Sequence, residues 1–388
     1  MTLTVVLGIR PDVIRASIIL RKLHEELKTN FEFIWSGQHY SNNMKDVFFQ
    51  QLSVPSPTSE LKIDTSSDAS ISGTIIKELS QHLIRSKPKG VVFLGDTNTV
   101  LGSIAAAMLN IPIIHIEGCM RSYDWRMPEE KNRTIIDHIS DKIYCYLDEY
   151  KLQGLSEGLR SENIIVTGNP IVDVINQNFF SGKVRMNTDE LNTYFKSLKI
   201  EKDDYFLITC HRRENIMNYA SLKNIIRLIS NLKSKSIFVA GYKTQLMLKE
   251  FSIDVPDSTT IIDPIGYREI LELSYNSLGV LSDSGTLIEE SCILGIPSIQ
   301  MRKSTERPQV YDVGSSIKFD PTLDYSDDEL RAKIELMQGI LKSSWKHPFG
   351  DGNSSEIIAN NLLECYESDK FQGHEPDFSS SNVLRSYK

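Results

Sequence analysis

Acidic side chains and a histidine follow short apolar strings in this sequence, at places where they could carry protons. Asp96 comes directly after the string GVVFLG, Glu117 ends IPIIHIE, and His211 follows YFLITC with two arginines beside it. Carboxylates and histidine are the usual general acids and bases of enzymes. A carboxylate at the end of a buried strand also needs a partner, so structural pairing with a nearby arginine is the alternative for Glu117.

A further group of charged residues lies in the string MRSYDWRMPEEKNRTIIDHISD. Glu129 and Arg133 are four residues apart at the start of a helix that Pro128 would begin, so they share one helix face. An ordinary surface ion pair would explain these two residues, and a helix cap would explain Asp96. Neither alternative explains the whole cluster as easily, so the pattern favours a functional site.

Residues in three other places could hold a phosphate group. Two of these places are turns before predicted helices, where backbone N–H groups favour an anion, and the third is the cation-rich string MRKSTERP. In the helix predicted after the second of these places, Glu290 lies about one and a half helical turns from the start and could reach ribose hydroxyls. A solvated arginine and a plain helix cap are the alternative interpretations. The residues concerned are Arg10 in the first turn, Ser284, Gly285, Thr286 and Glu290 in the second, and Arg307 in the third.

The elements that must position these residues alternate between short apolar strands and helices, which is typical of parallel sheets covered on both faces. Ligands gather at the carboxyl ends of such strands. The predicted fold is α/β, with two doubly wound Rossmann-like domains that face each other across a cleft. We expect an N-terminal domain over residues 1–172, a C-terminal domain over 173–368 whose last helix packs back on the first domain, and a poorly ordered tail over 369–388.

The expected strands follow from the apolar strings. In the first domain they cover 3–8, 31–36, 90–95, 113–117 and 144–146. In the second domain they cover 205–209, 236–240, 259–262, 279–282 and 298–300. Helices are expected over 11–27, 75–86, 99–109 and 132–141, with helical stretches between the later strands.

Composition limits the classes of partner. The 388 residues carry a formal net charge of −8, so nucleic acid and anionic membrane surfaces are not expected partners. The five cysteines lie far apart without a CxxC pair, which argues against a disulfide framework and a structural zinc. No apolar run approaches the ~20 residues of a membrane helix, and no secretory signal precedes the first strand. We therefore expect a cytoplasmic protein.

Nine strings, in this order, resemble the non-hydrolysing UDP-N-acetylglucosamine 2-epimerase family. They are GIRPDVIRAS, SGQHY, GDTNT, HIEGCMRS, MPEEKNR, TGNP, CHRREN, SDSGTLIEES and MRKSTERP, and the likeness runs from about residue 3 to about residue 365. The resemblance implies a fold of the glycosyltransferase-B type with UDP in the interdomain cleft, and a homodimer. It implies no metal, nicotinamide or flavin, which agrees with the absence of GxGxxG after the first strand.

The family's reaction inverts carbon 2 of a UDP-N-acetyl-hexosamine, which serves as a precursor of surface polysaccharides. The bond between carbon 1 and UDP breaks with loss of the carbon 2 proton, and the resulting glycal takes UDP and a proton back. By the resemblance, catalytic positions are Asp96, Glu117, Glu129 and His211. Substrate contacts are Arg10, Arg133, Ser284, Gly285, Thr286, Glu290 and Arg307, and Arg15 stands where a basic residue is usual. Gln38 and His39 match a region that forms a regulatory UDP-sugar site in some bacterial members.

Departures from the family pattern concern the sugar. EGCMR, a shortened RSYDWRMPEE and DSGTLIEES stand where EAGLR, a longer loop and DSGGIQEE are usual, and a usual histidine is replaced near Gly241. These features are similar to the branch acting on 6-deoxy or otherwise modified sugars, such as UDP-2-acetamido-2,6-dideoxy-L-talose. UDP-N-acetylglucosamine and UDP-N-acetylmannosamine stay open as substrates. So do three other functions: a glycosyltransferase on the same fold, a hydrolysing 2-epimerase, and a UDP-sugar sensor without turnover.

Overall fold

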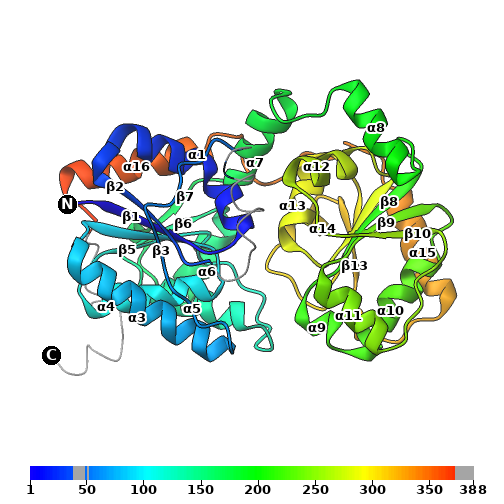
Figure 1. Cartoon of the computed structure of the whole chain (residues 1–388), viewed down its shortest axis with the longest axis horizontal. Helices are drawn as coiled ribbons and strands as arrows, with labels where there is room; N and C mark the ends of the chain where they lie inside the picture. The colour runs from blue at the N-terminus through cyan, green and yellow to red at the C-terminus, as the bar shows by residue number, and fades with distance from the viewer. Residues whose placement is uncertain (38–48, 50–51, 372–388) are drawn as a thin grey trace. The chain divides into compact units, whose positions relative to one another are not determined.

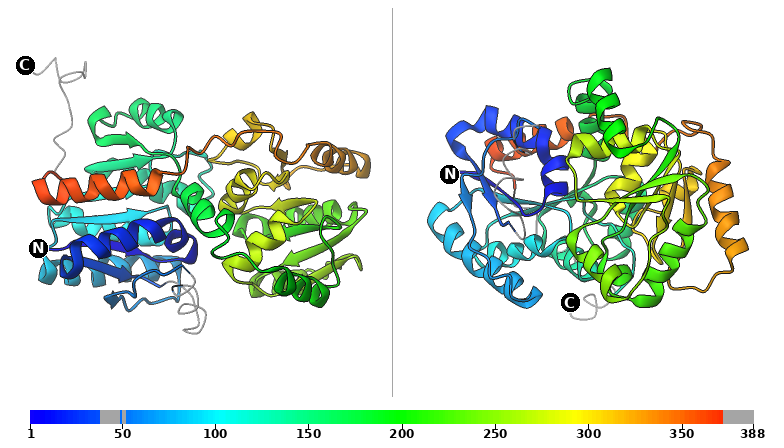
Figure 2. Two further views of the ribbon diagram at one scale, coloured as in Figure 1. Left: turned by 90° about the horizontal axis from the view of Figure 1, so that it is seen from above. Right: turned by 45° about the vertical axis from the view of Figure 1, so that its right-hand side comes forward.

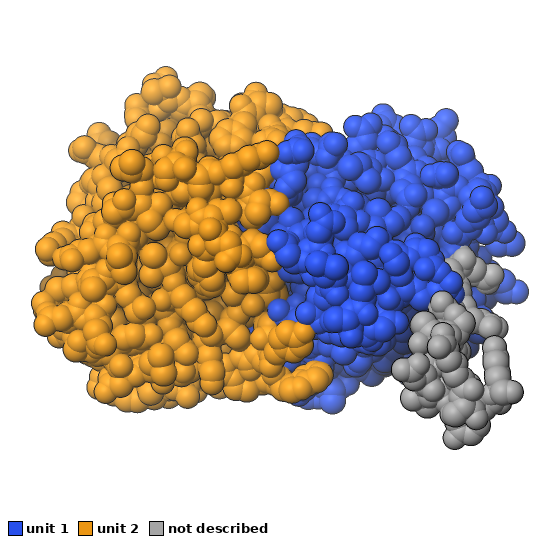
Figure 3. Space-filling model, turned by 180° about the vertical axis from the view of Figure 1, so that it is seen from behind, with its two compact units in different colours: residues 1–121, 127–174, 349–388 blue, residues 122–126, 175–348 orange. Residues whose placement is uncertain are grey.

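The structure is a computed structural model that describes residues 1–37, 49 and 52–371. Gln38, His39 and most of the predicted tail lie outside these residues. The chain divides into two units, coloured separately in Figure 3. Unit 1 comprises Met1–Arg121, Met127–Val174 and Phe349–Lys388, and unit 2 comprises Ser122–Arg126 and Ile175–Pro348. The chain thus leaves unit 1 twice and returns to it at its end.

In its described residues, unit 1 contains a parallel sheet with the strand order β3-β2-β1-β4-β5-β6-β7. The five residues of β1 are all buried, as expected for a strand covered on both faces. Figure 1 shows α1 and α16 over one face of the sheet and α3, α4 and α5 over the other.

The bounds in unit 1 are as follows. The strands are β1 (Leu3–Leu7), β2 (Phe31–Trp35), β3 (Ser59–Glu60), β4 (Gly90–Leu94), β5 (Ile113–Ile116), β6 (Lys142–Cys145) and β7 (Ile164–Val166). The helices are α1 (Arg10–Leu27), α3 (Asp68–Ser86), α4 (Ser103–Met108), α5 (Pro128–Ile139), α6 (Asp148–Ser156), α7 (Pro170–Ile175) and α16 (Ser354–Ser368), with short 3-10 turns at Lys28–Asn30, Asn98–Gly102 and Ser161–Asn163.

Unit 2 repeats this plan with the order β10-β9-β8-β11-β12-β13, again parallel throughout. The strands are β8 (Tyr205–Thr209), β9 (Lys235–Val239), β10 (Thr259–Ile262), β11 (Gly279–Ser282), β12 (Ser298–Met301) and β13 (Ser316–Phe319). The helices are α8 (Thr188–Leu198), α9 (Arg213–Ile216), α10 (Tyr219–Ser230), α11 (Tyr242–Glu250), α12 (Tyr267–Tyr275), α13 (Gly285–Ile293), α14 (Gln309–Asp312) and α15 (Asp327–Gln338), after a π-helical turn at Asn176–Phe180. Apolar residues of α10 and α15 pack on the strands to form its core.

The strand order places the functional edge of each unit. In both sheets the connections run outward in opposite directions from a central strand pair, which is β1 and β4 in unit 1 and β8 and β11 in unit 2. The loops after such a pair diverge and leave a crevice at the carboxyl ends of the strands. The predicted fold class of two doubly wound Rossmann-like units is therefore confirmed.

Several elements differ from their expected bounds. Helix α3 begins seven residues before 75, at Asp68, because the Ser67 hydroxyl accepts a hydrogen bond from Ser70 N (3.1 Å) and caps the helix. Helix α5 begins at Pro128, the start predicted from that proline, and so extends the periodic stretch expected over 132–141 toward the N-terminus. The helix expected over 99–109 starts as a 3-10 turn. The unpredicted strands β3, β7 and β13 are short, lie at sheet edges and are only partly buried. Strands β3 and β13 contain polar residues, and β7 is a run of only three apolar residues.

The last described helix, α16, packs on unit 1. Figure 2 shows α16 lying beside α1, and these two helices contact each other. The buried Asp173 carboxylate accepts hydrogen bonds from Ser354 N and Ser355 N, which fixes the start of α16. All five cysteines are free and buried. Of the described helices, none has the length and apolar character required to span a membrane.

Candidate active site

Glu117 lies directly after β5 and is almost fully buried. The Arg15 Nη1 group pairs with Glu117 Oε2, and the Tyr146 hydroxyl donates to the same oxygen at 3.3 Å. The backbone of Glu117 has a φ of +76°, in the left-handed region that side chains rarely adopt. Such a conformation costs on the order of 1–3 kcal/mol and is typically found at functional sites. Pairing with an arginine, the structural alternative, is thus real, but it does not account for the strained backbone.

Asp96 follows β4 at the same edge of the sheet. Its carboxylate pairs with Arg133 Nη2, and its carbonyl oxygen accepts a hydrogen bond from Asn132 Nδ2 at 3.0 Å. The Asp96 side chain is 24% exposed, whereas Arg133 is buried, so the carboxylate can still meet a ligand. The residue at the cap position of the following 3-10 turn is Thr97 rather than Asp96.

Glu129 and Arg133 are both in α5, but the buried acidic partner of Arg133 on its own helix is Glu130. The Arg133 Nη1 group lies 2.9 Å from Glu130 Oε2, and both side chains are about 2% exposed. The predicted spacing of four residues thus missed a partner three residues away, although both spacings share a helix face. Glu129 is half-buried in the first turn of the helix.

Next to these carboxylates lies a group of buried, hydrogen-bonded side chains whose role the sequence did not indicate. His115 is fully buried and bonds Asp137 Oδ1 through Nδ1 (2.7 Å) and the Gly95 carbonyl oxygen through Nε2 (2.8 Å). Asp137 also accepts from Cys119 N and Arg121. Burial raises the pKa of Asp137, but hydrogen bonding and charge from His115 and Arg121 lower it further, so its net pKa lies below the usual value. His115 therefore fixes the backbone immediately before Asp96.

In unit 2, His211 follows β8 and has a side chain that is 57% exposed. Its Nδ1 lies 3.5 Å from Oδ1 of Asp283, a fully buried residue after β11. Asp283 also accepts hydrogen bonds from the backbone N–H groups of His211 (3.1 Å) and Arg212 (2.9 Å) and from Asn215 Nδ2 (3.1 Å). Asp283 thus holds the loop that contains His211 in place. In the sequence, only its position in the string SDSGT indicated that Asp283 could be functional.

The Ser284–Thr286 turn begins α13, as predicted, but its groups have separate uses. The Ser284 hydroxyl accepts from Leu287 N at 3.4 Å and caps the helix. A Cβ added to Gly285 would lie 2.7 Å from Arg307 Nη1, so glycine allows the guanidinium to approach the helix start. Thr286 is half-buried in the first turn. The cap interpretation is therefore correct for Ser284 but does not explain Gly285.

The predicted basic site after β12 contains buried acidic residues as well. Arg307 Nε lies 2.8 Å from Glu289 Oε1, and the same guanidinium pairs with Glu306. Arg302 pairs with the other oxygen of Glu306 at 3.1 Å. These carboxylates offset much of the positive charge that the string MRKSTERP predicted, because the sequence could not show that Glu306 and Glu289 point inward with the arginines.

Glu290, predicted to reach a ribose, is buried in α13 beside Tyr267. Burial and the adjacent Glu290 raise the pKa of the Tyr267 hydroxyl well above its usual value, so Tyr267 is a neutral donor at neutral pH. Arg10, the remaining predicted contact, is the first residue of α1 and follows β1 at the switch point of unit 1.

The shortened loop RSYDWRMPEE belongs in part to unit 2, because Ser122–Arg126 is grouped there. Asp124 accepts a hydrogen bond from Ser304 Oγ at 2.8 Å, and Arg126 contacts both of its carboxylate oxygens. The hydrogen bonds from Arg126 and Ser304 hold the pKa of Asp124 well below its usual range. Tyr123 and Trp125 on either side of it are exposed.

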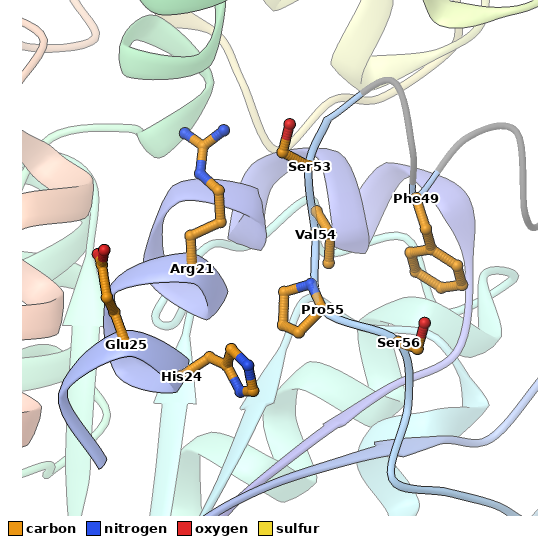
Figure 4. Close-up of a pocket in the computed structure, with 8 residues that line it drawn as sticks. All are labelled: Arg21, His24, Glu25, Phe49, Ser53, Val54, Pro55 and Ser56. Atoms are coloured by element: carbon orange, nitrogen blue, oxygen red, sulfur yellow. The ribbon is translucent and has the colours of Figure 1, made fainter. Parts of the chain in front are cut away.

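Unit 1 also has an open pocket of about 680 Å³, and none of the described residues that line it is a predicted site residue. Figure 4 shows its lining, which comes from the later part of α1 and from the segment after Phe49. Arg21 in this lining lies three helical turns beyond Arg10, away from the carboxyl edge of the sheet. The carboxylates, rather than the volume of this pocket, therefore mark the candidate active site.

Comparison with known proteins identifies the family. The family model for UDP-N-acetylglucosamine 2-epimerase matches residues 21–363. The chain is 38% identical over 371 residues to the UDP-N-acetylglucosamine 2-epimerase of Methanocaldococcus jannaschii, with 93% of this chain and 99% of that protein covered. The chain belongs to the UDP-N-acetylglucosamine 2-epimerase family. Epimerases are isomerases, so the predicted family and enzyme class are both confirmed.

Two further relatives refine the comparison. A crystal structure of the M. jannaschii UDP-GlcNAc 2-epimerase in complex with UDP-GlcNAc and UDP matches with a TM-score of 0.85 at 37% identity, covering 94% of this chain and all of that one. The UDP-2,3-diacetamido-2,3-dideoxy-D-glucuronate 2-epimerase of Pseudomonas aeruginosa is 28% identical over 372 residues, covering 94% of this chain and all of that protein. The family therefore includes a relative named for a modified sugar, as the resemblance implied.

Replacing Gly285 with alanine is expected to raise the KM for the UDP-sugar about tenfold or more, the scale of one hydrogen bond to a charged group. The added methyl group would displace the Arg307 guanidinium from the start of α13. Steady-state kinetics would measure the change. Gly73→Ala is the matched control, because no atom lies within 4 Å of the added Cβ in α3. An unchanged KM in the Gly285 variant would separate Arg307 from substrate binding.

Proposed function

We propose that the chain inverts carbon 2 of a UDP-linked N-acetyl amino sugar by eliminating UDP and adding it back. The observation that carries this proposal is the acidic edge of unit 1, where Asp96 and Glu117 follow neighbouring strands and each contacts a buried arginine. Carboxylates held in this way are suited to moving a proton at a fixed position on a ligand. Membership in the epimerase family supports the same reaction.

The proposed reaction balances without a redox step. A base removes the carbon 2 proton while the bond between carbon 1 and the UDP oxygen breaks, and UDP leaves with the bonding electrons. The sugar becomes a glycal with a double bond between carbons 1 and 2. A proton then adds to carbon 2 from the opposite face, and the UDP oxygen bonds carbon 1 again. This route requires acid–base groups around one sugar and cations that stabilise the leaving diphosphate.

Each predicted catalytic and substrate-binding residue has a role in this proposal. The acid–base groups are Asp96, Glu117, Glu129 and His211. The groups that hold or orient the substrate are Arg10, Arg15, Arg133, Ser284, Gly285, Thr286, Glu290 and Arg307. The proposal assigns the sugar to the carboxyl edge of unit 1 and the UDP to that of unit 2. The start of α13 and the buried Arg307 beside it support the second assignment.

Hydrogen exchange at carbon 2 tests the reaction. We expect the protein, incubated with UDP-N-acetylglucosamine in deuterium oxide, to place deuterium on carbon 2 of both epimers, as read by NMR. Transfer of the sugar to an added acceptor without exchange would identify a glycosyltransferase. Accumulation of free UDP in step with sugar conversion would identify a hydrolysing epimerase. Binding without exchange for every sugar tried would identify a sensor.

The identity of the sugar, the location and the assembly are further parts of the proposal. A panel of UDP-N-acetyl sugars with and without the 6-hydroxyl would identify the substrate, and the P. aeruginosa relative makes modified sugars part of that panel. The free, buried cysteines support a reducing cytoplasm. A homodimer rests on the family resemblance alone, and light scattering coupled to size-exclusion chromatography would measure it.

A further inference from the structure

Asp12 is a buried carboxylate that no predicted role has used. It is the third residue of α1, its exposed fraction is 0%, and it lies at the carboxyl edge of the unit 1 sheet. Its Oδ1 lies 3.0 Å from Arg15 Nη2. Its Oδ2 is buried and receives no hydrogen bond within the described part of the chain. Half of this carboxylate is therefore without the donors that a buried anion needs.

The charges around Asp12 make a second observation. Arg15 contacts Asp12 through Nη2 and Glu117 through Nη1. The charged groups that act on Asp12 include Arg15 on its own helix, Glu117 after β5 and Asp96 after β4. A single guanidinium cannot balance two buried carboxylates in contact with it. The charge of Asp96 acts on Asp12 in the same direction as that of Glu117, although Asp96 also pairs with Arg133. Like charges this close favour binding of a proton by one of the carboxyl groups.

The hydrogen bonds indicate which carboxyl group holds that proton. Glu117 Oε2 receives both the Arg15 guanidinium and the Tyr146 hydroxyl. Asp12 receives Arg15 on one oxygen, and its other oxygen has no donor. The anion of Glu117 is therefore the better stabilised of the two, and the proton belongs on Asp12.

We propose that Asp12 is a positioning residue that carries a proton at neutral pH. In this state it does not compete with the ionised Glu117 for the Arg15 guanidinium. Burial supports this assignment by raising the pKa of Asp12, which Arg15 lowers and the charges of Glu117 and Asp96 raise again, to about 8. The inference rests on the proposed function, because it describes how the carboxylate of Glu117 is kept in its active form. Above pH 8, an ionised Asp12 would compete with Glu117 for Arg15.

The first test compares three variants over pH 6 to 10. Asp12→Asn mimics the protonated acid, Asp12→Leu removes its polar contacts, and Asp173→Asn is a control that alters a buried carboxylate at the start of α16. We expect Asp12→Asn to keep kcat/KM within about threefold of wild type at pH 7, and Asp12→Leu to lose about tenfold or more, the scale of a lost hydrogen bond to a charged group. Wild type and Asp173→Asn should lose about tenfold in kcat/KM per pH unit above pH 8, a loss absent from Asp12→Asn.

Two kinetic outcomes would overturn the proposal. If Asp12→Asn loses as much activity at pH 7 as Asp12→Leu does, the ionised carboxylate is the form required. If Asp12→Asn keeps its activity and also keeps the alkaline loss, another group titrates there.

A second test does not depend on turnover or on the variant's activity. Infrared difference spectra of the wild type should show the C=O stretch of a protonated carboxylic acid at pH 7 that disappears as the pH rises through about 8. The band should persist in Asp173→Asn and be missing in Asp12→Asn. Absence of this band in wild type and Asp173→Asn would overturn the proposal even if the epimerisation assay succeeds. Its presence in a protein without exchange at carbon 2 would instead overturn the proposed function.

The same proton makes stability depend on pH. The folded chain holds it up to about pH 8, whereas an unfolded Asp releases it near its model value of 3.8. The stabilisation is fully present below the unfolded pKa and is lost as the pH rises through the folded one. Between pH 5 and 8 the Tm of wild type should therefore fall relative to that of Asp12→Asn. A constant difference in Tm over this range would contradict the assignment.

Discussion

Replacing Glu117 with glutamine is expected to lower the turnover of the UDP-sugar by at least about 100-fold, the usual scale for losing an acid or base group. Glutamine preserves the size of the side chain but cannot accept a proton in its place. It also removes the negative charge that Arg15 Nη1 contacts, so the guanidinium would turn toward Asp12. Measuring kcat together with carbon 2 exchange would show whether both fall, as the loss of a proton carrier requires.

Glu32→Gln is the matched control for this variant. Glu32 is a partly buried carboxylate on β2 that contacts His82 (2.6 Å) and Thr4 (2.8 Å) near the amino ends of the strands, away from the site. The substitution should reduce stability, because it removes two hydrogen bonds to a charged group, and should leave kcat near the wild-type value. Equal rates in the Glu117 and Glu32 variants would remove Glu117 from the mechanism and leave the structural ion pair as its role.

Asp96→Asn should also lower turnover by about 100-fold or more, because it removes the other carboxylate at this edge. The asparagine amide cannot neutralise Arg133, which is buried and would lose one of the acidic groups that it contacts, while keeping Glu130. Losing one partner of a buried charge is costly, so a modest loss of stability should accompany the loss of activity. Kinetics and thermal unfolding of the same sample would measure the two effects separately.

The control for Asp96 is Asp141→Asn. Asp141 precedes β6 and accepts a hydrogen bond from Ile113 N (2.8 Å) at the opposite edge of the same sheet. This variant should lose stability without losing kcat. A near-normal rate for Asp96→Asn would show that the proton transfers do not need this carboxylate, and normal rates for both Asp96→Asn and Glu117→Gln would leave the acidic edge without a catalytic role.

Much of the unit architecture followed from local pattern. Strands β8 and β11 are short, buried and mostly apolar, and their bounds at Tyr205–Thr209 and Gly279–Ser282 agree with the predicted ones. Parallel strands all end at one edge, so polar residues placed after such strings must gather there. That rule was sufficient to predict that Asp96 and Glu117 lie at the same edge of one sheet.

Side-chain directions were less predictable. Alternation along a strand places His115 and Glu117 on one face, but β5 ends at Ile116 and Glu117 takes a left-handed conformation, so the alternation stops between them. His115 is buried in the interior and bonds Asp137. A local period cannot anticipate a backbone reversal that surrounding contacts impose.

Residue type and order alone were enough to predict two α/β units. They also predicted an acidic edge on the first unit and, on the second, a helix that begins with a turn of small residues. Tertiary structure decided the ionic partners. Arg15 contacts both Glu117 and Asp12, and Arg133 contacts both Glu130 and Asp96. Glu306 and Glu289 offset the positive charge of Arg307 after β12. The reason is physical. The periodicity of a segment tells which face a side chain occupies, whereas the ionic partner depends on which distant segment the packed core brings within about 3 Å of it.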